Sequence, residues 1–453
     1  SGFMHQPSWP LPGVGKGTCH RIHFTAQVQV SPAFGAYPLS LSARDSTVSD
    51  HGKWTVVDGG VSAARGFSSA GVEARLRYRD RPDLGIIRCS ERAAVAGVFT
   101  KNRFASPTIQ HDREQIERSG GYARAIVVNA GNANAATGAA GLEDARAMTD
   151  ATAAGLGIPA EEALVSSTGV IGEPLPMDAV GAGIDAAVAA LDGGGNGDFP
   201  RCIMTTDTAR KEAAVELTIN GEAVRVGGCC KGSGMIAPNM ATMLAFVTTD
   251  AAIEPTLLQQ MLRRAVARTF NRISVDGDES TNDTVFLMAS GLSQPVETHT
   301  EAGRRFEEAL EEVCRELAKK IARDGEGATR LIEVQVTGAK DEADAERAAA
   351  AVAESNLVKT AVYGEDANWG RIACALGYSG SEFAQENVAI GIGDVRLVEG
   401  GVRVEYSEED ATAQLKADPV HIAIDLGAGA GEATFWSCDL TEGYIEENAS
   451  YRS

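Results

Sequence analysis

Thr242 is the side chain in this sequence whose surroundings best suit nucleophilic chemistry. It lies in residues 231–246, KGSGMIAPNMATMLAF, where two glycines allow close backbone approach and Pro238 and Asn239 make a turn before an apolar strand. A hydroxyl at such a junction, preceded by the small residue Ala241, can attack its own preceding carbonyl to give an ester that water opens. The segment therefore predicts internal cleavage that leaves Thr242 as a new N-terminus.

Cleavage before Thr242 would also supply the base that its hydroxyl needs. A threonine hydroxyl is a poor nucleophile near neutral pH and requires an adjacent base. The freed α-amine has a reference pKa of about 7.7–8.0 and is held on the same residue, so no histidine is required. Two simpler interpretations stay open on the residues alone. Thr242 could be an ordinary β-branched strand residue, or Lys-Gly-Ser-Gly could bind phosphate, although it lacks the GxxxxGK[ST] pattern.

The sequence predicts no metal site. Residues 276–282, DGDESTN, place oxygen atoms at alternate positions, as calcium loops do. Thr281 stands where such a loop needs glycine, however, and Leu287 stands where it needs an acid, so we expect a hydrogen-bonded turn instead. The eight cysteines form no CxxC and no cluster with histidine at zinc spacing, which indicates buried, reduced thiols.

Length and charge limit the class of protein. A chain of 453 residues exceeds the size at which a single core keeps growing, so two cores or lobes are expected. A net charge of −21 argues against nucleic acid as a partner, because phosphate binding needs clustered lysine and arginine. The sequence has no apolar run of about eighteen residues, which argues against a membrane-spanning helix.

The first residues differ in composition from the rest. Residues 1–44 contain no aspartate or glutamate and are well supplied with arginine, histidine, serine and proline. That composition is typical of an organelle transit segment, and no compact apolar stretch of a secretory signal is present. We therefore expect residues 1–50 to be a transit or disordered segment addressed to the chloroplast, with the mitochondrion and the cytoplasm as alternatives.

The remainder alternates between strand-like and helix-like patterns, which predicts an α+β fold. The clearest element is a hairpin over residues 211–226, where two alternating segments flank Asn220-Gly221 and favour a type I′ turn. Further strands are predicted over 94–100, 124–129, 243–249 and 331–337, and helices over 141–156, 177–191, 254–268, 301–323 and 340–355. Short strands are expected to fill most of the rest, and composition does not reveal the boundary between the lobes.

The segment KGSGMIAPNMATML closely resembles the self-processing site of the ornithine acetyltransferase family, also called the bifunctional glutamate N-acetyltransferases of arginine biosynthesis. The resemblance runs from about residue 59 to residue 453. Further matching segments occur in the same order: NAGNANAATG at 129–138, SSTGVIG at 166–172, MTTDT at 204–208, VDGDESTNDT at 275–284, DGEGATRLIEV at 324–334, NWGRIA at 368–373 and CDLTEGY at 438–444.

This resemblance implies a fold and a processed chain. The fold would be a layered sandwich of sheets and helices of the Ntn-hydrolase-like, aminopeptidase type, with a second, smaller α/β lobe. Cleavage between Ala241 and Thr242 would give an α chain with its folded part over 51–241 and a β chain over 242–453. Both chains would contribute to one fold, and the family implies a heterotetramer of two α and two β chains.

The resemblance also assigns roles to individual residues. Thr242 would be both the cleavage residue and the acetyl carrier, and Thr168 with Gly169 would form the oxyanion hole. The substrate contacts would be made by Thr205, Lys231, Glu326, Asn448 and Ser453, together with Thr242. Glu279, Arg210 and Ala367 depart from the family pattern, and none of them removes a proposed catalytic group.

The implied reaction is a ping-pong acetyl transfer without a cofactor. Thr242 takes the acetyl group from N-acetylornithine and passes it to glutamate, and acetyl-CoA is a further candidate donor as a co-substrate. Two alternatives stay open. One is a self-processing aminopeptidase or amidase of the same fold, in which water is the acceptor, and the other is a binding protein that never cleaves itself.

Overall fold

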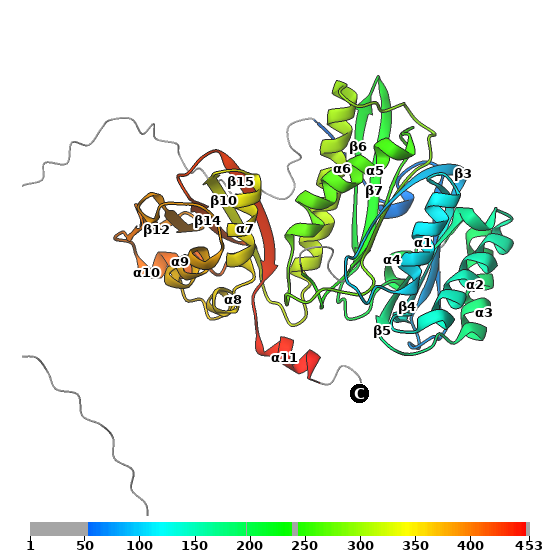
Figure 1. Ribbon diagram of the computed structural model, residues 1–453, viewed down its shortest axis with the longest axis horizontal. Coiled ribbons are helices and arrows are strands. Elements are labelled where there is room, and N and C mark those ends of the chain that lie inside the picture. Colours follow the sequence, from blue (N-terminus) through cyan, green and yellow to red (C-terminus); the bar gives the residue numbers. More distant parts are fainter. Residues whose placement is uncertain (1–52, 196, 238–242, 450–453) are drawn as a thin grey trace, which may run out of the picture. The chain divides into compact units, whose positions relative to one another are not determined.

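Two β-sheets organise the part of the chain that can be described. The computed structural model describes residues 53–195, 197–237 and 243–449, and its elements are labelled in Figure 1. The predicted transit segment 1–50, the Ala241–Thr242 link and Ser453 lie outside the described residues. Helices and sheets are both abundant, so the predicted α+β class is confirmed.

The first sheet has nine strands in the order β1-β6-β7-β8-β9-β3-β4-β5, with β2 paired to β3. Most neighbours are antiparallel, while β8 runs parallel to β9 and β4 runs parallel to β5. The strands are β1 (Thr55–Val56), β2 (Phe67–Val72), β3 (Leu84–Phe99), β4 (Tyr122–Asn132), β5 (Ala163–Val170), β6 (Lys211–Ile219), β7 (Glu222–Lys231), β8 (Leu244–Thr249) and β9 (Thr284–Ala289).

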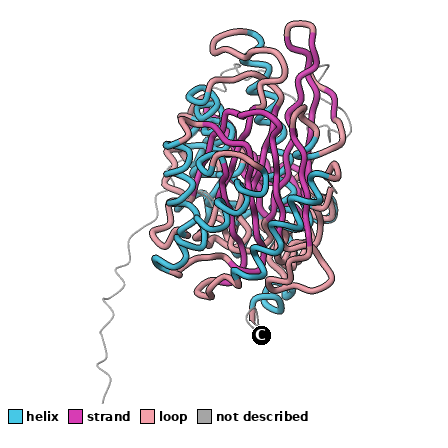
Figure 2. The backbone as a smooth tube through the Cα atoms, turned by 90° about the vertical axis from the view of Figure 1, so that its right-hand side faces the viewer, coloured by secondary structure: helices cyan, strands magenta, loops and turns pink. Residues whose placement is uncertain are grey.

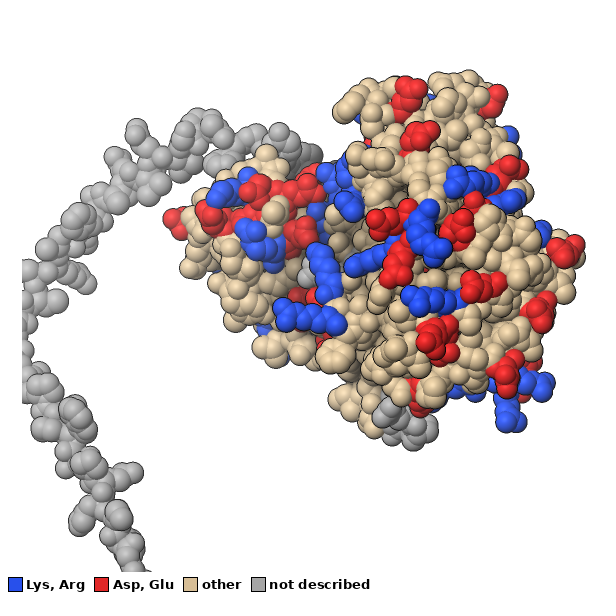
Figure 3. All heavy atoms as spheres, turned by 45° about the vertical axis from the view of Figure 1, so that its right-hand side comes forward, with Lys and Arg blue, Asp and Glu red and all other residues tan. Residues whose placement is uncertain are grey.

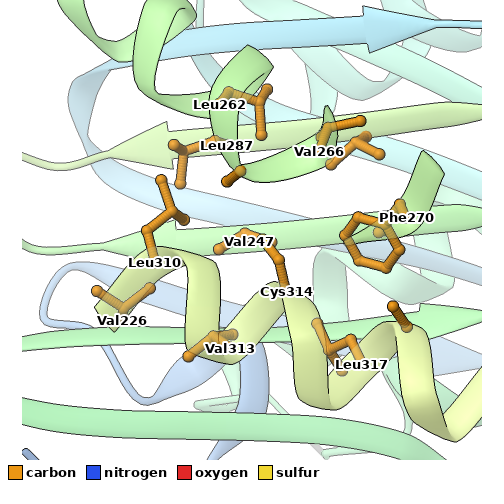
Figure 4. Close-up of a cluster of buried hydrophobic side chains, with 14 of the residues drawn as sticks. Val226, Val247, Leu262, Val266, Phe270, Leu287, Leu310, Val313, Cys314 and Leu317 are labelled. Carbon is orange, nitrogen blue, oxygen red and sulfur yellow. The ribbon is translucent and has the colours of Figure 1, made fainter. Parts of the chain in front are cut away.

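Two amphipathic helices pack on this sheet: α5 (Pro255–Arg268) lies mainly against β3, and α6 (Glu301–Arg323) lies mainly against β6 and β7. The buried residues of α6 recur at three- and four-residue spacing, so one stripe of the helix faces the sheet. Figure 4 shows Val247 of β8 and Leu287 of β9 in the cluster that this packing creates. The helices that cover β2 to β5 are α1 (Pro107–Arg118), α2 (Gly138–Leu156), α3 (Met177–Asp192) and α4 (Phe199–Cys202).

The second sheet has six strands in the order β13-β12-β11-β14-β10-β15 and forms a smaller lobe with its own core. Figure 2 distinguishes the strands of both sheets from the helices beside them. The strands are β10 (Leu331–Ala339), β11 (Ala389–Ile392), β12 (Val395–Glu399), β13 (Val402–Arg403), β14 (Val420–Asp425) and β15 (Gly431–Cys438). The layered sheet with helices and the second, smaller lobe are both as predicted.

Local sequence explains several element boundaries. Asn220 has φ 50° and Gly221 has φ 86°, the positive values that a type I′ turn requires, so the predicted hairpin is confirmed as β6 and β7. Ser106 begins α1 by accepting a hydrogen bond from the Thr108 N–H, and Gly157 ends α2 in the left-handed region. The predicted strand 243–249 is β8, all six residues of which are buried.

The expectation that short strands fill most of the remaining chain is confirmed only in part, because β11 to β15 are short strands but helices occupy as much of this region. Beyond α7 (Glu342–Ala353), the described residues include four further helices. All four are short, with 7 to 10 residues each, and the first two begin after the capping residues Ser355 and Asn368, whose side chains accept from the backbone N–H three residues on. Helices this short give a weak periodic signal, so their caps were the better guide. The helices are α8 (Asn356–Tyr363), α9 (Trp369–Tyr378), α10 (Glu408–Gln414) and α11 (Glu442–Asn448).

The described residues also show the distribution of surface charge and the burial of the cysteines. Basic and acidic side chains are interspersed on the face shown in Figure 3. Of the cysteines in the described ranges, all are free and most are buried, but Cys374 is exposed, which corrects the prediction that all are buried. No helix of the described part of the chain has the length and apolar character needed to cross a membrane.

Candidate active site

In the sequence, the predicted nucleophile falls between the segments that form two neighbouring strands. β7 ends at Lys231, β8 begins at Leu244, and these two residues are register partners in the sheet. Thr242 and Ala241 lie outside the described residues, so the chain resumes at Met243. The Met243 N–H donates to Asp283 Oδ1 at 3.0 Å, which anchors the chain directly after the predicted nucleophile.

The predicted oxyanion residues, Thr168 and Gly169, lie at the end of β5, where the strand pairs with Ala130 and Gly131 of β4. Gly169 has φ 133°, and a Cβ there would lie 2.3 Å from the carbonyl carbon of Gly131. Only glycine therefore allows the backbones of β4 and β5 to come this close together. Thr168 is 3% exposed, so its hydroxyl lies in an interior where a hydrogen bond to a developing negative charge is strong.

A single dipeptide, Asn282-Asp283, connects these two regions. Asn282 Nδ2 donates to the carbonyl oxygens of Ser167 and Ala133, at 2.8 and 2.6 Å, while Asp283 holds Met243. Burial raises the pKa of the Asp283 carboxyl well above its usual range, and the Met243 N–H and the charge of a lysine oppose that rise. The residues beside the predicted oxyanion pair and directly after the predicted nucleophile are thus held by two adjacent side chains.

Hydrogen bonds to backbone groups bring three of the predicted substrate contacts together. Asp207 accepts from the Thr205 N–H at 3.0 Å and from the Gly232 N–H, directly after Lys231, at 2.7 Å. The Glu326 N–H donates to the carbonyl of Ser233 at 2.9 Å. Thr205, Lys231 and Glu326 therefore border one site although they come from three parts of the chain.

Gly234 leaves the space that the Glu326 carboxylate occupies. A Cβ at this glycine would lie 2.2 Å from Glu326 Oε2. The same oxygen accepts from Asn448 Nδ2 at 2.8 Å, and Thr441 Oγ1 donates to the carbonyl of Gly327 at 2.7 Å. The C-terminal helix α11 is therefore docked beside Glu326, which brings two of the predicted substrate contacts, Asn448 and Glu326, together. Ser453 lies outside the described residues.

Two buried lysines and two aspartates set the charge of the site. Lys211 Nζ donates to Asp207 Oδ1 at 2.6 Å and also to Asp324. Burial alone would raise the pKa of Asp207, but the charges of Lys231 and Lys211 lower it to about 2. Burial lowers the pKa of Lys231, and the Asp207 carboxylate opposes that shift. The cluster therefore keeps Asp207 ionised beside Lys231.

Residues 276–282, whose oxygen spacing is similar to that of a calcium loop, form a hydrogen-bonded turn. Asp276 accepts hydrogen bonds from the N–H groups of Met235, Ile236 and Asp278, at 2.6, 2.8 and 3.1 Å. The Asp276 carboxylate therefore holds the backbone that follows Gly234. The predicted hydrogen-bonded turn is confirmed. The described residues contain no group of three or more histidine, cysteine, aspartate or glutamate side chains suited to a metal ion.

Comparison with known proteins identifies the family. Residues 68–453 match the ArgJ family. The chain belongs to the ArgJ family. Among its relatives, the arginine biosynthesis bifunctional protein ArgJ of Symbiobacterium thermophilum is 48% identical over 402 residues, which are 87% of this chain and 99% of the relative.

Solved structures of two proteins are also similar to this chain. The structure of arginine biosynthesis bifunctional protein ArgJ from Bacillus halodurans is 51% identical and covers 46% of this chain and 100% of its own, with a TM-score of 0.46. Ornithine acetyltransferase from Mycobacterium tuberculosis, complexed with ornithine, is 34% identical and covers 41% of this chain and 98% of its own, with a TM-score of 0.37.

In this ArgJ family member, the residues predicted to touch substrate are held by other residues that the family resemblance did not indicate. Asp207, Lys211, Asp324 and Asp283 were not singled out as site residues, and Asn282 was considered only as a metal ligand. All lie within or beside segments quoted for the family resemblance. Their polar side chains inside or beside these segments are the signal that could have found them, whereas their burial is visible only in the structure.

Proposed function

We propose that this ArgJ family member is a glutamate N-acetyltransferase of arginine biosynthesis that moves an acetyl group from N-acetylornithine to glutamate. The names of its relatives, at 44–48% identity over most of the chain, support this activity. The observation that carries the proposal is the grouping of Lys231, Thr205 and Glu326 beside the junction of β7 and β8. A buried cation, a hydroxyl residue and a carboxylate suit an amino acid that carries charges of both signs.

Thr242 carries the acetyl group in this proposal. Its hydroxyl oxygen attacks the acetyl carbonyl of N-acetylornithine while its own α-amine takes the hydroxyl proton. Collapse of the tetrahedral intermediate breaks the C–N bond, and the departing ornithine nitrogen takes that proton. The product is an acetyl ester on Thr242. The amine of glutamate then attacks this ester, and the same proton movements run in reverse.

Thr168 and Gly169 stabilise the oxygen that becomes negative in each intermediate. A donor placed for such an oxygen contributes about 3–4 kcal/mol, or roughly a hundredfold to a thousandfold in rate. The support for this role is the position of both residues at the end of β5, tied to the start of β8 through Asn282 and Asp283.

Self-cleavage between Ala241 and Thr242 creates the α-amine that serves as the base. β7 and β8, which flank this link, are hydrogen-bonded neighbours of one sheet, so the two products would stay paired after cleavage. N-terminal sequencing of purified protein tests this directly. One chain should begin TMLAFV, and Thr242→Ala should yield only uncleaved protein without transferase activity.

The assay that tests the reaction follows acetylglutamate and free acetate together. Wild-type protein with N-acetylornithine and glutamate should form acetylglutamate and ornithine in equal amounts, because each acetyl group removed from one substrate appears on the other. Formation of acetate instead would identify an amidase in which water is the acceptor.

Three further parts of the proposal concern the acetyl donor, the assembly and the location of the protein. Acetyl-CoA as a second donor is tested by the same assay with N-acetylornithine replaced. A heterotetramer of two α and two β chains, suggested by the family resemblance, is tested by the mass of the assembly in solution. Delivery to the chloroplast, suggested by the acid-poor residues 1–44, is tested by the location of a fluorescent fusion.

A further inference from the structure

Asp207 is a buried carboxylate that accepts hydrogen bonds from three separate parts of the site. It lies in the loop between α4 and β6 and is 8% exposed. Oδ1 accepts from the Gly232 N–H at 2.7 Å and from Lys211 Nζ at 2.6 Å, and Oδ2 accepts from the Thr205 N–H at 3.0 Å. Both oxygens are therefore committed to groups that border the substrate contacts.

These bonds connect the predicted substrate contacts to one another. Thr205 is itself one of those contacts, and Gly232 directly follows Lys231. Since one carboxylate accepts from both backbones, its position sets the separation between Thr205 and Lys231. A mispositioning of about 1 Å in such a site can cost about a hundredfold in rate.

The network continues from Lys211 towards Glu326. Lys211 also donates to Asp324, whose backbone carbonyl accepts from Ser233 Oγ at 2.7 Å. The carbonyl of Ser233 accepts from the Glu326 N–H at 2.9 Å. The Lys211–Asp207 pair is thus joined to all three substrate-contacting segments through described hydrogen bonds.

The charge of Asp207 acts on Lys231. Lys231 is 2% exposed, and burial of an ammonium group favours its neutral form. Burial lowers the pKa of Lys231, the negative charge of Asp207 raises it, and the positive charge of Lys211 lowers it. Glu326 and Asp283 also raise it. Only a charged Lys231 can form an ion pair with a substrate carboxylate.

We infer that Asp207 is a positioning residue for the transfer reaction: it sets the separation of Thr205 and Lys231 and keeps Lys231 charged for the substrate's carboxylate. This inference rests on the proposed function, because the substrate is the amino acid assigned there. A purely structural role for the buried Lys211–Asp207 pair is the alternative, since such pairs often hold a fold without serving a reaction.

Two substitutions at one position separate charge from geometry. Asp207→Asn removes the charge with little change in shape, whereas Asp207→Glu keeps the charge and displaces it by one methylene. Arg210→Gln is the matched control, because Arg210 lies one residue from Lys211 but forms an exposed pair with Asp198 at 3.1 Å. For each variant, kcat and KM for N-acetylornithine are measured from pH 6 to pH 10, together with the thermal midpoint.

Asp207→Asn should raise KM by about tenfold or more while kcat falls less, because ground-state binding is lost. Its KM should also begin to rise at a lower pH than in the wild type, since the lysine then loses its proton more easily. Asp207→Glu should raise KM without moving that pH. Arg210→Gln should match the wild type in both respects.

A lowered thermal midpoint for Asp207→Asn, with KM and its pH dependence unchanged in the folded enzyme, would assign the pair a structural role only and overturn the inference. Calorimetric binding of ornithine at pH 7 and pH 9 gives the same comparison without turnover. Wild-type protein that binds ornithine but transfers no acetyl group would refute the proposed function and leave the test of Asp207 intact.

Discussion

Substitution of Gly234 by alanine should disable the site while leaving the fold intact. The added Cβ would lie 2.2 Å from Glu326 Oε2 and 2.3 Å from the carboxylate carbon. Both atoms belong to the end of a flexible side chain, and the backbone of Gly234 does not have a positive φ. Glu326 can therefore rotate away at low cost in folding free energy.

The functional cost follows from the distance that Glu326 must move. Ordinary contact begins at about 3.4 Å, so the carboxylate must move by roughly 1 Å, which also breaks its hydrogen bond with Asn448. A displacement of that size in a positioned group can lower the rate by about a hundredfold, or roughly 2.7 kcal/mol of transition-state stabilisation.

The assay compares kcat/KM for N-acetylornithine with the thermal midpoint and the extent of chain cleavage. We expect kcat/KM to fall by about a hundredfold and the midpoint to stay within a few degrees of the wild type. Gly181→Ala is the matched control, because a Cβ at Gly181 in α3 meets no atom within 4 Å and alanine favours a helix. Wild-type kcat/KM in Gly234→Ala would refute the reasoning, and so would a collapse of stability.

Three further predictions concern other parts of the structure. Asn282→Ala removes the amide donor from the carbonyls of Ser167 and Ala133, and Ala133 keeps only a long contact with Ser106 Oγ at 3.4 Å, so chemical denaturation should show a loss of about 1–3 kcal/mol and kcat should fall. Gly169→Ala, with φ 133° and a Cβ 2.3 Å from the carbonyl carbon of Gly131, should lower the thermal midpoint and kcat together, and an unchanged kcat would argue against its oxyanion role. Burial lowers the pKa of His111 to about 4, so the stability present above pH 6.5 should decline as the pH falls towards 4, and His111→Gln should flatten that part of the pH–stability curve.

The local pattern of the sequence predicted much of the secondary structure. The hairpin over 211–226, the buried strand over 243–249 and the amphipathic helix over 301–323 are all present, because turn chemistry and hydrophobic periodicity act within a few residues. The predicted strand over 94–100 is only the end of β3, which begins at Leu84 and carries an irregularity between Arg88 and Ala93. A bulge interrupts the alternation that a sequence pattern relies on.

By itself, the sequence determined the family and the α+β class and led to a prediction of the residues that would contact substrate, because these depend on residue types and their order. Only the tertiary structure decided how those residues are held. Asn282 bonds to the carbonyl of Ser167, 115 residues away, and Asp207 bonds to the N–H of Gly232, 25 residues away. Partnerships of this kind leave no local pattern, because they arise only when the sheet brings distant strand ends together and excludes water around them.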